Sequence, residues 1–277
     1  MPLDISMIIL SDIHSRFEYL NYLLEIVEDI DLLVCLGDID KYNKFTSEAH
    51  DFFNSLGSKI RLKLISGNCD PDSYRNYLLE NPNLSLEQKW ETHNNYTIGG
   101  FGGIIPFSNF IRRARSFLNG KKVTKQLQAN IEKEFEDILY LKVNNGYYQC
   151  TDETPEMQKR WIDEETIYYI NENEIYNFFT STRSIISNEI WFTHNPPYDF
   201  PESKGIGVSS GSIGLYNAIK EIQPFLVISG HLHKEGIWTI GKTICLSTPP
   251  LEEGKFVKIE IKNNEIKYKF HKIKEKN

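Results

Sequence analysis

The sequence predicts an α/β fold with a parallel sheet, because three strand–loop–helix units follow one another at its start. Each unit opens with a short apolar run of the kind that forms a strand covered on both faces, at residues 6–10, 33–36 and 62–65. Apolar spacing predicts a helix over residues 20–27, and Gly57 is a suitable C-cap for a second helix over 46–56. Right-handed crossovers then bring the carboxyl ends of all three strands to one edge of the sheet.

The composition is that of a folded protein with a sizeable core: 277 residues, 40% apolar and 25% charged. A net charge of −7 gives no sign of binding to nucleic acid or to an anionic membrane. No apolar stretch approaches the roughly 20 residues of a membrane span, and the N-terminus does not resemble a secretory signal. The four cysteines form no C-x-x-C pair. We therefore expect reduced thiols in a cytoplasmic protein.

The middle of the chain differs in character, and we interpret residues 108–187 as a helical insertion within a single domain of residues 1–277. Apolar residues at helical spacing between Val123 and Ile138 predict one helix, and residues 157–179 predict a second, with a turn at residues 144–146 between them. The insertion is a candidate cap over the site. Its aromatic residues are assigned to the core by default, with a cap or a subunit contact, and hence an oligomer, as alternatives: Tyr168, Tyr169, Tyr176, Phe178 and Phe179.

A basic cluster stands at the start of this insertion and consists of Arg112, Arg113, Arg115, Lys121 and Lys122. A solvated helix face is the favoured reading, because runs of charge usually are that. If the insertion caps the site, these cations would instead attract an anionic substrate.

The last part of the chain returns to strands, which we expect at residues 189–193, 225–229, 236–240, 243–247, 255–261 and 266–270. A Ser/Gly-rich loop leads into a helix over residues 215–221. Asn263 and Asn264 between the last two strands are a hairpin turn signal.

Side chains that bind metals recur where these strands end. Five strand ends carry, in order, Asp12 with His14, Asp38, Asn68, His194, and His231 with His233. Each of these residues alone is better explained as part of a turn or as a side chain with ordinary hydrogen-bond partners. Seven such residues at five strand ends, however, predict a dinuclear cation site. Residues two apart can reach one cation, and an aspartate between the pairs can bridge two cations roughly 3.5–4 Å apart.

The motifs Asp12-Ile13-His14, Gly37-Asp38, Gly67-Asn68-Cys69-Asp70, His194 and Gly230-His231-Leu232-His233 resemble the calcineurin-like metallophosphoesterase superfamily. That family has D-x-H, G-D, G-N-H-D/E, a lone H and G-H-x-H in this order. The resemblance covers about residues 6–106 and 188–270. The glycine run before Pro106 and the segment 211–215 also look like the branch related to cyclic-nucleotide phosphodiesterases.

The resemblance implies a four-layer α/β/β/α sandwich of two mixed sheets and two divalent metal ions. One metal would be bound by Asp12, His14, Asp38 and His233, and the other by Asp38, Asn68, His194 and His231. Mixed nitrogen and oxygen ligation makes manganese the first choice, with iron, nickel or zinc as alternatives. The implied reaction is hydrolysis of small or nucleotide-like phosphodiesters by a hydroxide that bridges the metals. Duplex nucleic acid and membranes are not expected partners.

One position departs from the family pattern, because Cys69 replaces the histidine that assists the leaving group. The catalytic set carried over is therefore Asp38, Asn68, Cys69 and His194. A thiol is a poor general acid compared with imidazolium, so we expect activity to persist on aryl esters and to be weak on alkyl esters. The alternative is a catalytically weak or inactive scaffold that acts through protein interaction.

Two neighbours of these motifs carry further expectations. Asp70 is expected to orient a ligand rather than to act on the substrate. Arg16, together with Asn68, is a candidate contact for a substrate phosphate, because a guanidinium matches that geometry. A solvated side chain at the start of a helix is the equally weighted reading of Arg16.

Overall fold

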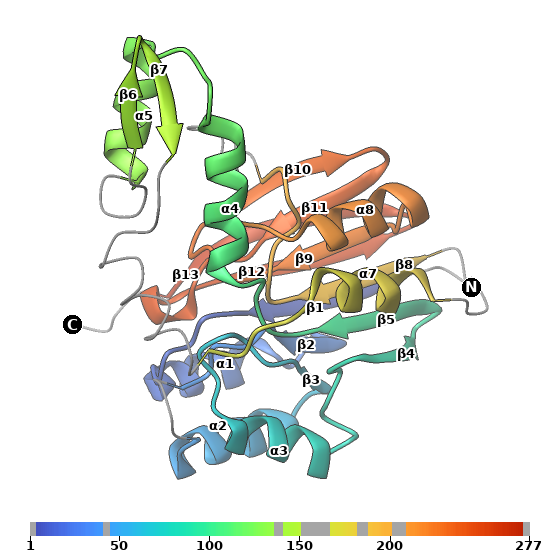
Figure 1. Ribbon diagram of the computed structural model, residues 1–277. Helices are drawn as coiled ribbons and strands as arrows, with labels where there is room; N and C mark the ends of the chain where they lie inside the picture. Colours follow the sequence, from blue (N-terminus) through green and yellow to red (C-terminus); the bar gives the residue numbers. More distant parts are fainter. Residues whose placement is uncertain are drawn as a thin grey trace.

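The computed structural model describes residues 4–40, 45–135, 141–150, 167–181, 188–200 and 209–273. Its strands form two mixed sheets packed face to face, and helices cover both outer faces (Figure 1). This arrangement is the expected four-layer α/β/β/α sandwich. In the described part of the chain, no helix is both long and apolar enough to cross a membrane.

The first sheet has five strands in the order β13-β12-β1-β2-β3. β1 pairs in parallel with β2, and β2 pairs in parallel with β3, whereas β12 and β13 are antiparallel. The bounds are β1 (Ile5–Leu10), β2 (Leu32–Cys35), β3 (Leu62–Leu64), β12 (Lys255–Lys262) and β13 (Glu265–Lys272). The three parallel strands predicted at the start of the sequence are therefore neighbours at the centre and one edge of this sheet.

The second sheet has six strands in the order β10-β11-β9-β8-β5-β4. The four inner strands β11, β9, β8 and β5 are parallel, and the two edge strands are antiparallel to them. The bounds are β4 (Lys89–His93), β5 (Tyr96–Phe101), β8 (Glu189–Thr193), β9 (Leu226–Ser229), β10 (Gly236–Ile240) and β11 (Thr243–Ser247).

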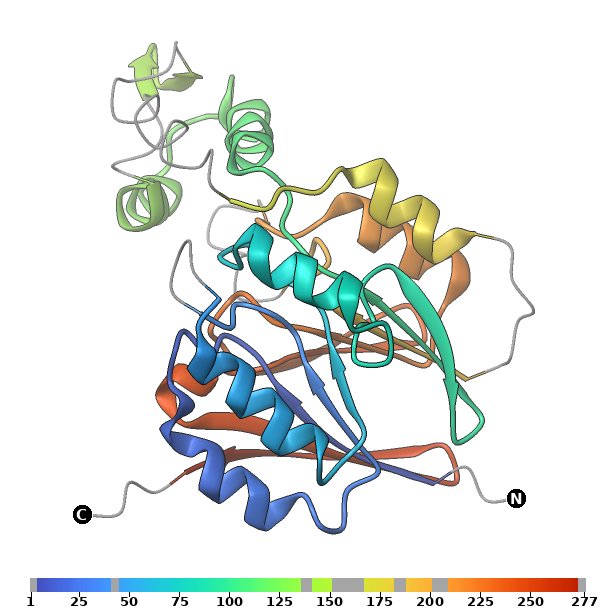
Figure 2. The ribbon, with the colours of Figure 1, turned by 90° about the horizontal axis from the view of Figure 1, so that it is seen from below.

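Helices on the two outer faces complete the sandwich, as Figure 2 shows from below. The face of the first sheet is covered by α1 (Leu20–Ile26), α2 (Ser47–Gly57) and α3 (Asp72–Glu80). The face of the second sheet is covered by α7 (Glu172–Thr180) and α8 (Ile213–Ile222). Two short 3₁₀ turns, η1 (Phe17–Tyr19) and η4 (Leu251–Glu253), lie beside α1 and before β12.

The alternation of side chains along β1 explains why its sequence is apolar throughout. Met7 and Ile9 point into the core between the two sheets, whereas Ile8 and Leu10 point into the core under α1, α2 and α3. Successive side chains of a strand face opposite ways, so a strand buried on both faces needs apolar residues at every position. The continuous apolar run read from the sequence therefore marks a central strand.

The predicted insertion contains strands as well as helices. It comprises α4 (Phe107–Leu118), α5 (Lys125–Phe135), and a hairpin of β6 (Leu141–Asn144) and β7 (Tyr147–Cys150). The predicted turn is the loop of this hairpin, because Asn145 and Gly146 both have the positive φ that a tight two-residue loop requires. Figure 1 shows α5 and the hairpin standing away from the sheets at the far end of α4.

The insertion has its own small core, and its last part belongs to the main body. Ile111, Leu118, Ile131 and Tyr148 are buried together in this separate core. The second predicted helix is described only from residue 167, and α7 begins at Glu172 with a capping box formed by its N-cap residue Asn171. Residues 157–166 of that prediction lie outside the described residues. α7 packs on the second sheet, which agrees with the default assignment of its aromatic residues to the core.

Candidate metal centre

The seven side chains predicted to bind metals meet at the edge where β1, β2, β3, β8 and β9 end. Among the described residues, three groups have ligand atoms within 4.8 Å of one another. The groups are Asp12 with His14 and His233, His14 with Asp38 and Cys69, and Asp38 with His194 and His231. Asn68 joins the third group through its oxygen, which lies 2.9 Å from Nε2 of His194. The structure thus brings together loops that are up to about 220 residues apart in the sequence.

The first half of the centre brings the ring nitrogens of two histidines and a carboxylate oxygen close together. Nε2 of His14 lies 3.4 Å from Nε2 of His233, and Nε2 of His233 lies 3.1 Å from Oδ1 of Asp12. Oδ2 of Asp12 accepts hydrogen bonds from the Ser11 hydroxyl and from the backbone N–H of His231. Oδ1 is buried and faces the ring of His233.

The second half places two acceptors against each other. Nδ1 of His194 lies 2.7 Å from the carbonyl oxygen of Leu36, which can only accept, so Nδ1 carries the hydrogen. In the neutral ring, Nε2 of His194 then has a lone pair, and it faces Oδ1 of Asn68 at 2.9 Å. Asn68 is oriented this way because its Nδ2 donates to the sulfur of Cys69. Only a proton or a cation between these two atoms makes the contact favourable.

Asp38 lies between the two halves. Its Oδ2 is 3.8 Å from Nε2 of His14 and 3.5 Å from Nε2 of His194. Its Oδ1 accepts a hydrogen bond of 2.7 Å from the backbone N–H of Cys69. One oxygen of this carboxylate is therefore directed at both groups of histidines, as a bridging ligand requires.

Charges within the centre shift the pKa values of its members in both directions. Burial alone raises the pKa of the Asp12 carboxyl, but the contact with His233 and the charge of His194 outweigh burial and hold this pKa well below its usual value. Burial lowers the pKa of His194, but the charges of Asp38 and Asp12 outweigh it and raise that pKa. Burial and the charge of His194 lower the pKa of His231 to about 4, so its imidazole is neutral near pH 7 and can bind a cation.

The donor set fits a pair of divalent transition-metal ions. It offers imidazole nitrogens, two carboxylates and an amide oxygen, a mixture that suits manganese, iron, nickel or zinc better than calcium or magnesium. The approach of Asp12 Oδ1 to Nε2 of His233, the facing nitrogens of His14 and His233, and the facing acceptors of His194 and Asn68 are all explained if cations lie between them.

The backbone at the centre adopts a conformation that L-residues avoid. Positive φ angles occur at Asp12 (52°), His14 (45°), Asp38 (54°), His231 (70°) and His233 (51°). The left-handed region costs a non-glycine residue roughly 1–2 kcal/mol, and such strain concentrates at functional sites. The short turns after the strands therefore aim side chains into the centre at the expense of backbone energy.

Gly37 and Gly67 let the two central loops touch. A Cβ atom on Gly37, whose φ is 93°, would lie 2.1 Å from the backbone nitrogen of Gly67. A Cβ atom on Gly67 would lie 2.1 Å from Oδ1 of Asp38. Asp70 ties the same loops together, because its carboxylate accepts hydrogen bonds from the backbone N–H groups of Asp38, Ile39 and Gly67. Asp70 thus holds together the two loops that carry the candidate ligands Asp38 and Asn68.

Three residues that the sequence did not assign to the site also hold the loop of Asn68 and Cys69. Glu87 accepts hydrogen bonds from Ser66 and from the backbone of Gly102, and Arg75 donates to the carbonyl oxygen of Asp70. The backbone N–H of Tyr168 donates to the carbonyl oxygen of Asn68. Nothing local in the sequence indicates these contacts, because they join segments distant in the chain.

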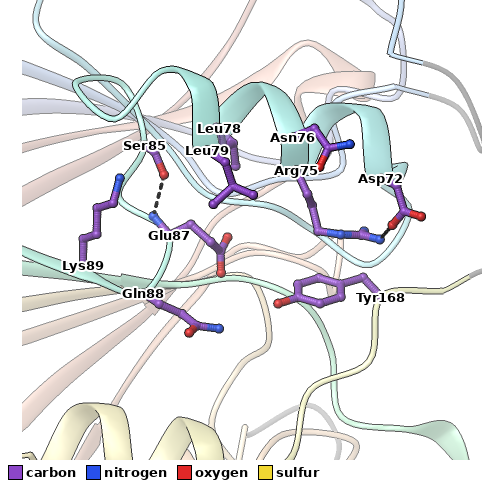
Figure 3. Close-up of a pocket in the computed structure, with 10 residues that line it drawn as sticks. All are labelled: Asp72, Arg75, Asn76, Leu78, Leu79, Ser85, Glu87, Gln88, Lys89 and Tyr168. Carbon is purple, nitrogen blue, oxygen red and sulfur yellow. Dashed lines mark hydrogen bonds and ion pairs between the residues drawn. The ribbon is translucent and has the colours of Figure 1, made fainter.

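A cavity of about 580 Å³ lies beside this loop. Figure 3 shows the Arg75 guanidinium over the ring of Tyr168, 4.4 Å from its centroid, with Glu87 next to them. The lining residues come from α3, from the segment before and at the start of β4, and from Tyr168: Asp72, Arg75, Asn76, Leu78, Leu79, Ser85, Glu87, Gln88, Lys89 and Tyr168.

Two arginines that were considered for contact with an anionic substrate, Arg16 and Arg113, have other partners. The Arg16 guanidinium forms an ion pair with Glu18 and donates to the hydroxyl of Tyr19. Arg113 of the basic cluster is mostly buried and donates to the carbonyl oxygen of Gly211, so it does not belong to a solvated helix face. Arg112, Lys121 and Lys122 are exposed, as that reading predicts.

Comparison with known proteins gives one family match. The sequence model of the calcineurin-like phosphoesterases matches residues 5–235. No curated protein matches the sequence.

Solved structures show the same fold at low sequence identity. TT1561 of Thermus thermophilus is 13% identical, with a TM-score of 0.58 over 96% of this chain and 98% of that chain. The phosphopantetheinyl hydrolase PptH of Mycobacterium tuberculosis is 13% identical, with a TM-score of 0.50 over 88% of this chain and 89% of that one. A putative 5'-nucleotidase of Staphylococcus aureus is 9% identical, with a TM-score of 0.52 over 93% of this chain and 51% of the other.

Proposed function

Since the chain belongs to the calcineurin-like phosphoesterase family, we propose that it hydrolyses small or nucleotide-like phosphodiesters at two divalent cations. The observation that carries this proposal is the position of Asp38, whose Oδ2 lies within 4 Å of a histidine from each half of the centre. A carboxylate in that position can hold both cations of an in-line displacement at phosphorus.

The residues of each half have separate parts in this proposal. Asp12, His14 and His233 would hold one cation, and Asn68, His194 and His231 would hold the other, with Asp38 shared. Bound cations supply positive charge to the phosphoryl oxygens and lower the pKa of coordinated water. The hydrogen bond from His194 to the Leu36 carbonyl fixes the tautomer that leaves Nε2 free to bind. Hydrogen bonds to Asp70 and Glu87 hold the loops of Asp38 and Asn68 in place.

The leaving group receives little help from the chain in this proposal. Cys69 occupies the position from which an imidazolium would donate a proton, and general acid catalysis is typically worth about 10²–10⁴-fold. We therefore propose faster turnover of aryl than of alkyl phosphodiesters. Cys69 is also the one feature that favours the alternative, a catalytically weak scaffold that acts by protein interaction.

Hydrolysis of bis(p-nitrophenyl) phosphate by metal-stripped protein, with manganese, iron(II), nickel or zinc added back, tests the proposal. We expect turnover only with added metal. In Asp38→Asn turnover should fall by more than about 100-fold, because even residues that merely support metal ligands are worth about 10–100-fold. Asp51→Asn, on the exposed side of α2, is the matched control and should retain full activity.

The same experiment separates the two candidate functions. Metal-dependent turnover that survives in Asp38→Asn would mean that the centre is not the active site. Metal binding by the wild-type protein with no turnover of aryl or alkyl esters would instead support the scaffold.

A further inference from the structure

We infer that Cys69 is a sulfur ligand of the metal centre, and that it shifts the preference of the centre from manganese toward zinc, cobalt or iron(II). The inference rests on the proposed metal centre but not on its reaction. It adds to the nitrogen and oxygen ligands expected from the sequence a soft ligand that the family pattern does not contain.

The position of the sulfur carries the inference. Sγ of Cys69, a ring nitrogen of His14 and a carboxylate oxygen of Asp38 all lie within 4.8 Å of one another. Ligand atoms around one tetrahedral zinc lie roughly 3–4 Å apart, so a small side-chain movement closes this group around a cation. Among the described residues, Cys69 is the cysteine that enters such a group.

The loop fixes the thiol in this position. The backbone N–H of Cys69 donates to Oδ1 of Asp38 at 2.7 Å, which leaves Oδ2 of the same carboxylate to face the histidines. Cys69 is only 8% exposed. Nδ2 of Asn68 donates to its sulfur at 3.3 Å, an N–H···S contact of the kind that supports ligating sulfur.

Further evidence for a cation near this place comes from the neighbouring group of Asp12, His14 and His233. Oδ1 of the fully buried Asp12 lies 3.1 Å from Nε2 of His233, which in turn faces Nε2 of His14 at 3.4 Å. His14 belongs both to the group with Asp38 and Cys69 and to the group with Asp12 and His233, so the two groups adjoin. The cluster is therefore part of a cation site and not an isolated cysteine.

The other cysteines lie in environments of a different kind. Cys35 and Cys245 are buried in the two outer apolar cores, and burial raises the pKa of Cys245 to about 12. The thiol of Cys150 donates to the carbonyl oxygen of Arg115 in the insertion. These cysteines provide matched controls for any spectroscopic signal that arises from sulfur.

A sulfur ligand changes which metals bind well. Thiolate favours zinc, iron and other soft or borderline ions, whereas manganese and magnesium prefer oxygen. Replacing Cys69 by serine should therefore weaken zinc and cobalt binding by about 10–100-fold, a range typical of single changes around a metal site, and manganese binding much less.

Titration of the metal-stripped full chain with cobalt(II), followed by absorption spectroscopy, tests this inference. We expect a sulfur-to-cobalt charge-transfer band in the near ultraviolet together with the visible ligand-field bands of bound cobalt. Cys69→Ser should lose the charge-transfer band and keep the visible bands, because the histidines still bind. Cys150→Ser should keep both.

Each outcome has a definite meaning. Visible bands without a charge-transfer band in the wild-type protein would overturn the sulfur ligand while leaving the proposed function intact. The absence of all cobalt absorption would remove the metal centre, and the proposed function with it. If Cys69→Ser does not fold, X-ray absorption of the zinc-loaded wild-type protein decides the matter: a Zn–S distance near 2.3 Å supports the inference, and a shell of nitrogen and oxygen alone overturns it.

Discussion

At the scale of single residues, the sequence indicated which side chains meet but not how they are held. Asp12, Asp38 and His194 could be picked out because each follows a predicted strand, and parallel strands share an edge. The left-handed backbone at Asp12 and Asp38, and the support from Glu87, could not be predicted, because they depend on contacts between distant segments. The sequence places Cys69 beside Asn68, but only the fold shows that its sulfur lies within 4.8 Å of ligand atoms of His14 and Asp38.

His93 gives a residue-scale prediction for the dependence of stability on pH. Nδ1 of His93 lies 2.7 Å from Nη1 of Arg61, and since a guanidinium only donates, the ring must accept and remain neutral. Burial, followed by the charge of Arg61, lowers the pKa of His93 in the folded protein. The unfolded chain, with a histidine pKa of about 6.5, therefore binds the proton more readily.

The sign follows from this difference. The neutral ring contributes its full stability above about pH 6.5, and that stability is lost as the pH falls below 6.5 toward the lower folded pKa. We expect the free energy of unfolding of the wild-type protein to fall more between about pH 7.5 and about pH 5 than that of His93→Gln, which has no proton to bind. Urea unfolding at both pH values measures this, and equal losses would show that His93 is not the group that titrates.

At the scale of elements, predictability depended on burial. β8, β10 and β11 have the predicted bounds, because their apolar or alternating residues mark them clearly. β4 was not predicted, and the helix of the third strand–loop–helix unit, α3, was expected without bounds. β4 is an edge strand with mixed sequence, and α3 buries only Tyr74, Tyr77 and Leu78 among polar residues, so neither has a continuous apolar signal.

The hairpin between β12 and β13 gives an element-scale prediction. Its two-residue loop is Asn263 (φ 51°) and Asn264 (φ 65°), and Lys262 pairs with Glu265 across it. This is the left-handed geometry of a type I′ turn, which asparagine and glycine tolerate. Asn264→Val should lower the free energy of unfolding by about 1–2 kcal/mol, and Asn264→Gly should leave it equal or slightly higher. Denaturant unfolding of both variants checks this, and equal effects of valine and glycine would contradict it.

At the scale of the whole molecule, the resemblance predicted the four layers, which composition and periodicity alone could not. The pattern of strands indicates an α/β class, but it does not say that the strands divide into two sheets. The hairpin and separate core of the insertion lay beyond the sequence, because residues 108–187 fall outside the matching motifs. The run of positive charges in the sequence also did not indicate that Arg113 is mostly buried whereas Arg112, Lys121 and Lys122 are exposed.

Arg113 joins the insertion to the main body and gives the prediction at this scale. Its Nη1 donates to the carbonyl oxygen of Gly211 at 3.0 Å and lies 3.9 Å from Oε1 of Glu172 at the start of α7. Hydrogen bonds from charged groups are worth about 1.5–3 kcal/mol, so Arg113→Ala should lower the free energy of unfolding by about that much. Arg112→Ala, on the exposed side of α4, should change it by less than about 0.5 kcal/mol. Thermal or urea unfolding compares the two variants. Similar losses of unfolding free energy would mean that the contacts of Arg113 with Gly211 and Glu172 do not stabilise the protein.

The cavity next to the loop of Asn68 has a consequence for ligand linkage. Arg75, Glu87 and Tyr168 line the cavity, and each also bonds to the segment of residues 66–70. Occupancy of the cavity and occupancy of the metal centre would therefore act on one shared segment. Coupling between two binding equilibria is reciprocal, so a compound in the cavity that tightened cation binding by about tenfold would itself be held about tenfold more tightly by the loaded protein. Compounds that bind the cavity could thus be ranked by how much their affinity changes when metal is removed.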